Sequence, residues 1–290
     1  MQTVAEYFEL PPVREYTPKS RKFKFDETMS KRLVGIEVEV ERVGDDESAP
    51  TGWQVKGDGS LRNNGVEFIT PPIAAGWAPG MFQRLLEFLD KEAAFTMRTS
   101  IHVHVNAQDL TLTKAYETLC WYTLVEPLLY RFVGRSRENS VFCVPLYKNN
   151  SATQLYSSSG QFQRPVDWRK YNGFNLACLS SMGTLEFRQM SGTDSIPHLT
   201  NWVKLVTRLV DFTKNNTGPT PREWLLGDVD YNYAWKTIQE ILGELTPLVD
   251  HFVTEDTIAT GLESMRKVFI GAPTHIPHSA SIEFVKKYSL

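Results

Sequence analysis

Cysteine is scarce in this sequence: 290 residues contain three, and no two of them form a CxxC pair. They stand far apart, at Cys120, Cys143 and Cys178. An odd, widely spaced set argues against a disulfide framework and against a cysteine-based zinc site. It fits a protein of a reducing compartment.

Long apolar runs are also missing. The longest candidate, 119–133, is interrupted by Glu126, Pro127 and Arg131, whereas a helix that spans a bilayer needs about 20 apolar residues. The first residues lack the basic-then-apolar pattern of a secretory signal. We therefore expect a cytoplasmic protein that does not enter a membrane.

An excess of charge of either sign is absent too, with 31 Lys and Arg against 34 Asp and Glu and a net charge of -3. This balance argues against a generally nucleic-acid-binding surface. Hydrophobic residues at 41% and charged residues at 22% are typical of a globular protein. The chain is long enough for one large domain or two small ones.

A predicted strand with two chemically different faces lies between residues 33 and 41. Side chains alternate between the faces of a strand, so Glu37, Glu39 and Glu41 share one face. The other face is aliphatic, with Val34, Ile36, Val38 and Val40. Carboxylates in such a row lie about 7 Å apart, and they repel one another unless solvent, a cation or basic groups compensate their charge. Considered alone, this strand is explained equally well by a half-exposed sheet face and by a metal site.

The same division of faces recurs in three later predicted strands. Their ionisable or polar side chains are Glu67 in 65–70, His102, His104 and Asn106 in 99–106, and Glu186 with Arg188 in 184–190. An ordinary wet sheet face carries more Thr, Lys and Ser. The recurrence favours a metal and phosphate site over a purely structural face.

The chemistry of these groups points to a divalent cation and an anion. Carboxylates suit Mg²⁺ or Mn²⁺, and imidazole shifts the preference toward Mn²⁺ or Zn²⁺. Arg188 and Arg169 carry planar guanidinium groups that bind phosphate oxygens in pairs. Simpler interpretations stay open: the HxH is incidental, Glu186 and Arg188 only pair with each other, and Asp58 only shapes a Gly-Asp-Gly-Ser turn.

The order of predicted elements, with strands first and helices last, indicates an α+β protein with one main sheet. We expect an extended N-terminal arm over 1–30, with a short helix at 4–8, and a single catalytic domain over 31–290. Its sheet core covers about 33–190 and its helical part about 197–290. The remaining expected elements are a strand at 53–56, helices at 79–93 and 113–133, an irregular segment at 135–165, a hairpin of 171–179 with 184–190, and helices at 199–214, 231–245 and 256–267.

Four motifs in this order resemble those of the amidoligases, or carboxylate-amine ligases. They are GIEVE at 35–39, DGSL at 58–61 with GVEFITPP at 65–72, HVHVN at 102–106 and LEFR at 185–188. The resemblance covers about half of the chain, from 35 to 190, and leaves out the arm and the helical C-terminal third. The family is related to the catalytic domain of glutamine synthetase and glutamate-cysteine ligase, and several members are encoded by bacteriophages.

The resemblance implies a curved, mainly antiparallel sheet with a concave metal and nucleotide face, backed by helices. It implies ATP-dependent joining of a small-molecule or peptide carboxylate to an amine through an acyl phosphate, with Mg²⁺ or Mn²⁺, in the host cytoplasm if a phage encodes the protein. No counterpart of the larger enzymes' N-terminal β-grasp domain is recognisable, and the two substrates and the oligomeric state stay open.

Residue roles carried over from the family are also expectations. The metal ligands would be Glu37, Glu39, Glu67, His104 and Glu186, and the nucleotide contacts His104, Asn106 and Arg188. Arg188, Arg169 and Asp58 would act in catalysis. Of the two histidines in the HxH motif, His104 rather than His102 is expected to be the ligand. Glu41, which lies nearer the strand end, is expected to be a bystander.

Three alternatives accompany this interpretation. A phosphotransferase resembling the guanidino kinases would keep the nucleotide site and make no amide. A non-catalytic, phage-associated binding protein would keep only the fold. A zinc hydrolase is the weakest of the three, because the sequence contains no HExxH motif.

Overall fold

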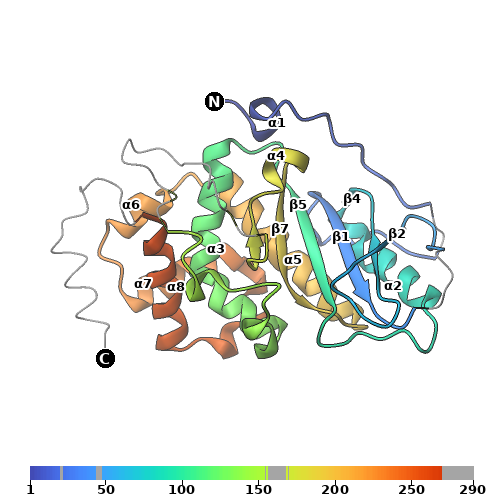
Figure 1. Cartoon of the computed structure of the whole chain (residues 1–290). Coiled ribbons are helices and arrows are strands. Elements are labelled where there is room, and N and C mark those ends of the chain that lie inside the picture. The colour runs from blue at the N-terminus through green and yellow to red at the C-terminus, as the bar shows by residue number, and fades with distance from the viewer. Residues whose placement is uncertain (20–21, 44–47, 154, 156–167, 169, 270–290) are drawn as a thin grey trace.

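One antiparallel sheet backed by helices dominates the computed structural model, which describes residues 1–19, 22–43, 48–153, 155, 168 and 170–269 (Figure 1). Within that part of the chain the strands are β1 Leu33–Val40, β2 Gln54–Gly57, β3 Val66–Ile69, β4 Ile73–Ala74, β5 Ser100–Asn106, β6 Phe174–Asn175 and β7 Thr184–Ser191. The α-helices are α1 Val4–Tyr7, α2 Ala78–Phe88, α3 Leu112–Val133, α4 Leu179–Met182, α5 Ile196–Asn215, α6 Pro221–Leu225, α7 Tyr231–Leu242 and α8 Glu255–Phe269. Short 3₁₀ helices are η1 Ala75–Trp77, η2 Arg135–Asn139, η3 Leu146–Lys148, η4 Gly243–Leu248 and η5 Asp250–Phe252.

Strands β1 and β5, which carry the GIEVE and HVHVN motifs, lie in the middle of the sheet. Its order is β2-β3-β1-β5-β7-β6, with β4 paired to β1, and every pairing is antiparallel. Strand β1 therefore lies between β3 and β5, so the GIEVE motif has the GVEFI strand on one side and the HVHVN strand on the other. The predicted α+β class, a mainly antiparallel sheet backed by helices, is confirmed.

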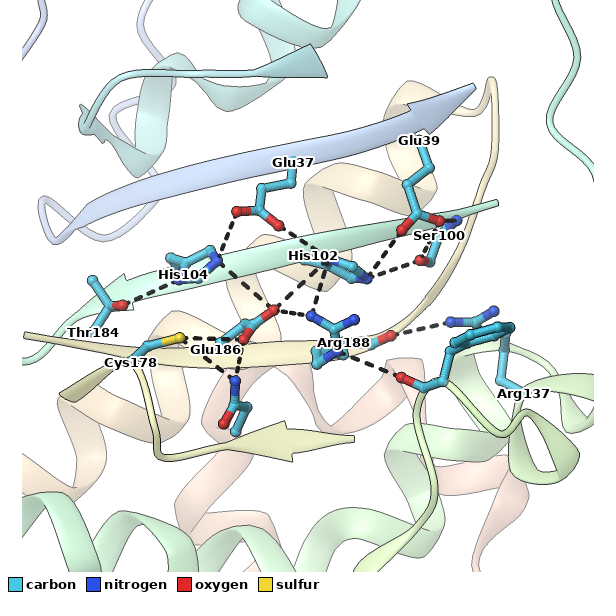
Figure 2. Close-up of polar contacts among 12 residues, drawn as sticks. Glu37, Glu39, Ser100, His102, His104, Arg137, Cys178, Thr184, Glu186 and Arg188 are labelled. Carbon is cyan, nitrogen blue, oxygen red and sulfur yellow. Dashed lines mark hydrogen bonds and ion pairs between the residues drawn. The ribbon is translucent and has the colours of Figure 1, made fainter. Parts of the chain in front are cut away.

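The aliphatic face of the sheet is covered by helices. Val34, Ile36 and Val38 of β1 and Val103 of β5 are buried, and helix α5 contacts β5 on that side. Figure 2 shows α5 behind the strands, on the face opposite the labelled site residues. Full burial of each such side chain contributes about 1.5–3 kcal/mol, so the alternation of β1 fixes which face is left for the polar groups.

Hydrogen bonds to the rest of the chain hold the N-terminal arm along much of its length. Near its start, Val4 is buried and its amide donates to the carbonyl of Leu110, just before α3. Farther on, the amide of Tyr16 donates to the carbonyl of Pro72. In Figure 1 the arm runs from α1, beside α4, toward the end of the sheet where β4 and β2 lie. The domain boundary expected near residue 30 stays a prediction.

The expected hairpin of 171–179 with 184–190 forms in a different shape. The two strands pair, Phe174 with Phe187 and Asn175 with Glu186, but β6 has two residues. The connection contains helix α4, which ends at Gly183 in the left-handed conformation (φ 68).

Other boundaries shift less. Helix α2 ends at Phe88 rather than at 93, and β4 and α6 were not predicted. The irregular segment expected at 135–165 contains η2 and η3, and part of it lies outside the described residues. Among the helices of the described chain, none is long and apolar enough to cross a membrane.

Candidate active site

The polar face of the central strands gathers the predicted groups into one place (Figure 2). We call them the glutamate–histidine cluster, defined by Glu37 and Glu39 of β1, Glu67 of β3, His102 and His104 of β5, and Glu186 of β7. The antiparallel register brings them together, since Glu37 lies opposite His102, Glu39 opposite Glu67, and His104 opposite Glu186.

His102 is the most connected member of the cluster. Its Nδ1 lies 3.1 Å from Oε2 of Glu37 and 3.8 Å from Oε1 of Glu186. On the other side of the ring, Nε2 lies 2.8 Å from the hydroxyl of Ser100 and 3.7 Å from Oε1 of Glu39. The side chain is 3% exposed, so this imidazole joins three carboxylates below the surface.

His104 has one ring nitrogen held and the other directed at carboxylates. Nδ1 lies 3.1 Å from the hydroxyl of Thr184. Nε2 lies 3.1 Å from Oε1 of Glu37 and 3.8 Å from Oε1 of Glu186. Within the described part of the chain this buried nitrogen pairs with the Glu37 carboxylate but does not meet the geometry of a hydrogen bond. A ring held through one nitrogen with the other facing carboxylates is the arrangement of a metal-binding histidine.

Glu39, Glu67 and Asp58 form the acidic end of the cluster. One oxygen of each lies within 4.8 Å of the others. Ser100 orients Glu39 by donating its amide and its hydroxyl to Oε2, at 2.8 and 2.7 Å. Asp58 also accepts from the amide of Ser60 at 2.7 Å, so it shapes its turn and still faces the two glutamates.

Glu186 and Arg188 of β7 form an ion pair, as the simpler sequence interpretation expected. Glu186 also accepts a hydrogen bond from the amide of Asn175 at 2.5 Å, and the thiol of Cys178 lies 3.3 Å away. Arg188 lies 3.5 Å from Nδ1 of His102. The guanidinium thus borders the cluster and adds positive charge beside four glutamates.

Ionisation in the cluster is set by burial and by its neighbours. Burial acts to raise the pKa of Glu37, but contacts with His102 and His104 outweigh it and hold this pKa well below its usual range. Burial likewise opposes ionisation of Glu186, yet His104, His102 and Arg188 lower its pKa. For His104, burial acts to lower the pKa, while Glu37 and Glu186 raise it above 6.5.

Glu67 is the exception among the glutamates. Burial and the charges of Glu37, Glu39 and Asp58 raise its pKa to about 8. A carboxyl group that close to other carboxylates requires either a proton or a cation.

The residues present fit a divalent metal. Three sets of donor atoms each lie within 4.8 Å of one another: Glu39, Asp58 and Glu67; Glu37, Glu67 and His102; and His104, Cys178 and Glu186. Oxygen donors with one or two imidazoles suit Mg²⁺ or Mn²⁺. A cation would explain two features: the buried Nε2 of His104 faces carboxylates without a well-formed hydrogen bond, and the pKa of Glu67 is raised.

Asn106 lines a cavity next to Glu37 and His104 but does not belong to the cluster. Glu41, expected to be a bystander, does not belong to it either. Asn106 stands at the end of β5, where its side-chain oxygen accepts from the amide of Gln108 at 3.1 Å. Glu41 accepts from Arg62 and Thr96 and belongs to none of the three donor sets. Arg169 lies outside the described residues.

Several contributors were not predicted. Ser100 and Thr184 share strand parity with the histidines and with Glu186, so the alternation that selected those residues also contained these two. Asn175 and Cys178 carry no such signal, because their contact with Glu186 depends on the short β6 pairing. Arg137 of η2 donates hydrogen bonds to the backbone carbonyls of Arg188 and Gln189. The alternation of side chains along the strands could not predict this contact either, because Arg137 does not lie on a strand.

A comparison with protein-family models supports the family that the motifs suggested. The family described as "Putative amidoligase enzyme" matches residues 14–210, more than half of the chain. A solved structure described as "Apo GmaS without ligand" is similar at 12% identity, covering 90% of this chain and 70% of that one, with a TM-score of 0.41. No curated protein matches the chain significantly.

Proposed function

The chain belongs to the amidoligase family, and on this premise we propose that it is an ATP-dependent carboxylate-amine ligase that works through an acyl phosphate. The observation that supports this most is the convergence of four glutamates, two histidines and Arg188 on one sheet face. A ligase-type function follows from the family; the nucleotide, the metal and the intermediate are the proposal.

The glutamate–histidine cluster would hold the divalent metal. Glu37, Glu39, Glu67, His104 and Glu186 are the proposed ligands, and His102 belongs with them because it contacts three of these carboxylates. A bound Mg²⁺ or Mn²⁺ would neutralise the negative charge of the phosphoryl group being transferred. Arg188 would bind phosphate oxygens from the edge of the cluster, exchanging part of its pairing with Glu186.

The proposed reaction has two steps. A carboxylate oxygen of the acid attacks the terminal phosphorus of ATP, the bond to ADP breaks, and an acyl phosphate forms. The amine nitrogen then attacks the acyl carbon, the bond to phosphate breaks, and the amine loses a proton as the amide forms. The chain's own part is to hold both substrates and to offset charge, since neither step needs a covalent bond to the protein.

A hydroxylamine assay tests the proposal without knowledge of the natural amine. The full chain is incubated with ATP, MgCl₂ or MnCl₂, hydroxylamine and a panel of amino acids, peptides and other carboxylic acids. The expected result is release of ADP together with an equal amount of hydroxamate for at least one acid. If ATP neither binds nor turns over across the panel with either metal, the proposal fails.

Matched variants connect the assay to the site. Glu39→Gln is expected to lower turnover by about a hundredfold or more, because it removes a charged ligand from the acidic end of the cluster. Glu87→Gln is the control, since this exposed carboxylate on α2 pairs with Lys22 and Gln83, far from the cluster in the sheet. Equal loss in both variants would indicate a general effect on the fold.

Product analysis separates the ligase from the guanidino-kinase alternative. A kinase would yield ADP and a stable phosphorylated guanidino compound, with no hydroxamate from any acid. Formation of that product alone would reassign the site to a phosphotransferase.

A further inference from the structure

A cavity of about 430 Å³ opens beside the glutamate–histidine cluster, between the N-terminal arm and the sheet. Most of its lining surface is apolar, with Leu10, Pro12 and Val13 from the arm and Leu33, Ile69 and Met182 from the sheet and α4. Uncharged polar residues such as Thr70 and Ser181 also line it. Glu37 and His104 belong to the same lining. The cavity therefore places an apolar space in direct contact with the candidate metal ligands.

The arm wall of the cavity is fixed at both ends. Before it, the amide of Leu10 donates to Ala5 and Val4 is buried against the segment that precedes α3. Within the wall, the carbonyl of Pro11 accepts a hydrogen bond from the side chain of Gln108. After it, the amide of Tyr16 donates to the carbonyl of Pro72. Residues 10–14 are thus held over the sheet by contacts that do not involve any occupant.

The glycine at position 35 is a second observation that suggests a bound ligand, in addition to the cavity itself. It lies in the interior of β1 on the face of Glu37, where a glycine weakens a strand. A Cβ atom there would meet only Cβ of His104, at 3.7 Å, which is ordinary contact. The protein itself therefore does not require glycine at this position, and a side chain added there would enter the cavity.

Two of the lining residues, Arg14 and Glu37, carry charges of opposite sign. Arg14 is exposed and makes no hydrogen bond or ion pair within the described residues. Glu37 is the most exposed acid of the central strands, at 21% of its side chain against 7% for Glu39 and 4% for Glu186. A guanidinium recognises a carboxylate, and a carboxylate attracts an ammonium group.

We propose that this cavity binds the amine substrate and that the substrate is an α-amino acid with a large apolar side chain. The side chain occupies the aliphatic space, the α-carboxylate pairs with Arg14, and the amino group faces Glu37 beside the site of the acyl phosphate. This assignment rests on the proposed ligase function, which supplies the reason for an amine next to the cluster.

Direct binding tests the assignment independently of turnover. Binding of L-phenylalanine and L-leucine to the full chain is measured by calorimetry or by saturation-transfer NMR, and compared with L-serine and L-aspartate. Two analogues isolate the charges: 2-phenylethylamine lacks the carboxylate, and 3-phenylpropionate lacks the amine. Phenylalanine is expected to bind at least about tenfold more tightly than either analogue, the scale of one charged hydrogen bond.

Variants test the place of binding. Gly35→Val is expected to fold, since a β-branched residue suits a strand, and to weaken phenylalanine binding by about tenfold or more because it fills the cavity. Arg14→Ala should weaken phenylalanine and leave 2-phenylethylamine unchanged, with Arg14→Lys restoring part of the affinity. Glu15→Ala, an exposed neighbour on the arm that does not line the cavity, is the control.

The outcomes separate this inference from the proposed function. Equal binding of serine and phenylalanine, unchanged binding in Gly35→Val, or competitive displacement of phenylalanine by ADP would overturn the assignment. Hydroxamate formation without phenylalanine binding would support the ligase function and contradict the assignment of the cavity to an apolar amino acid. Phenylalanine binding without any ATP turnover would support an apolar amino-acid site in the cavity, but it would contradict both the ligase and the role of that amino acid as its amine substrate.

Discussion

Glu39 of β1 and Glu67 of β3 lie directly opposite each other in the antiparallel register, and both are buried. Residues so paired have Cβ atoms about 4.5–5.5 Å apart, and like charges there are destabilising. Burial and neighbouring carboxylates raise the pKa of Glu67 to about 8. The pairing therefore lowers the stability of the metal-free protein, and a bound cation would relieve it.

Glu67→Gln is expected to separate stability from metal binding. At neutral pH and without metal, Glu67 must take up a proton when the chain folds, because its pKa is raised to about 8. Gln removes this cost and should raise the thermal midpoint by a few degrees, since about 1 kcal/mol moves a domain of this size by about 2–4 °C. With MnCl₂, the variant should lose most of the further rise that the unmodified protein shows. Differential scanning fluorimetry after EDTA treatment measures both effects.

Glu41→Gln is the control for Glu67. Glu41 directly follows β1, two residues after Glu39, and is also buried, but it accepts hydrogen bonds from Arg62 and Thr96. Its substitution should lower the midpoint and leave the MnCl₂ response intact. A Glu67→Gln protein that is less stable without metal, or that keeps the full response, would contradict the account.

Thr184→Val tests the positioning of His104. The hydroxyl of Thr184 lies 3.1 Å from Nδ1 of that ring, and loss of such a support lowers metal affinity by about 10–100-fold. The expected result is this loss in Mn²⁺ titration with an unchanged fold. Ser191→Ala, at the other end of β7 and hydrogen-bonded to Val133, should leave the affinity unchanged; equal losses would rule out a specific role for Thr184.

Glu126 predicts a pH dependence that is unrelated to the candidate active site. This carboxyl group in α3 is fully buried, and burial raises its pKa to about 7 against hydrogen bonds from Leu146, Tyr122 and Tyr147. The native state thus keeps a proton that the unfolded chain loses above about pH 4.5. The free energy of unfolding should fall as the pH rises from about 4.5 to 7, by up to about 3 kcal/mol from this group.

Urea unfolding at pH 5 and pH 8 checks this expectation. The decrease between the two values should be smaller in Glu126→Gln than in the unmodified protein, because the amide does not titrate. An identical pH difference in both proteins would show that Glu126 does not hold its proton.

Alternation along the strands was enough to predict much of the candidate site. In β1 and β5 it separated Ile36 and Val103 from Glu37 and His104 before any pairing was known. Burial strongly specifies such a register, because a slip of one residue would expose the aliphatic face. The motif strands, α3 and the C-terminal helices followed from the same periodicity.

The remaining features of the candidate site could not be predicted, because they depend on pairing between segments that are far apart in the chain. His102 was ranked below His104, although the register places it opposite Glu37 and in contact with three carboxylates. The short β6, helix α4 and the cavity wall made by residues 10–14 depend on contacts far apart in the chain. Local propensity contains little information on such contacts.

Anomalous X-ray scattering from crystals grown with MnCl₂ would show directly whether the glutamate–histidine cluster binds a divalent metal. We expect a manganese peak on the polar face of the sheet, coordinated by carboxylate oxygens of the cluster and by His102 or His104. Loss of that peak in Glu39→Gln crystals would connect it to the acidic end. A peak on another surface, or none at the cluster at saturating MnCl₂, would contradict the account.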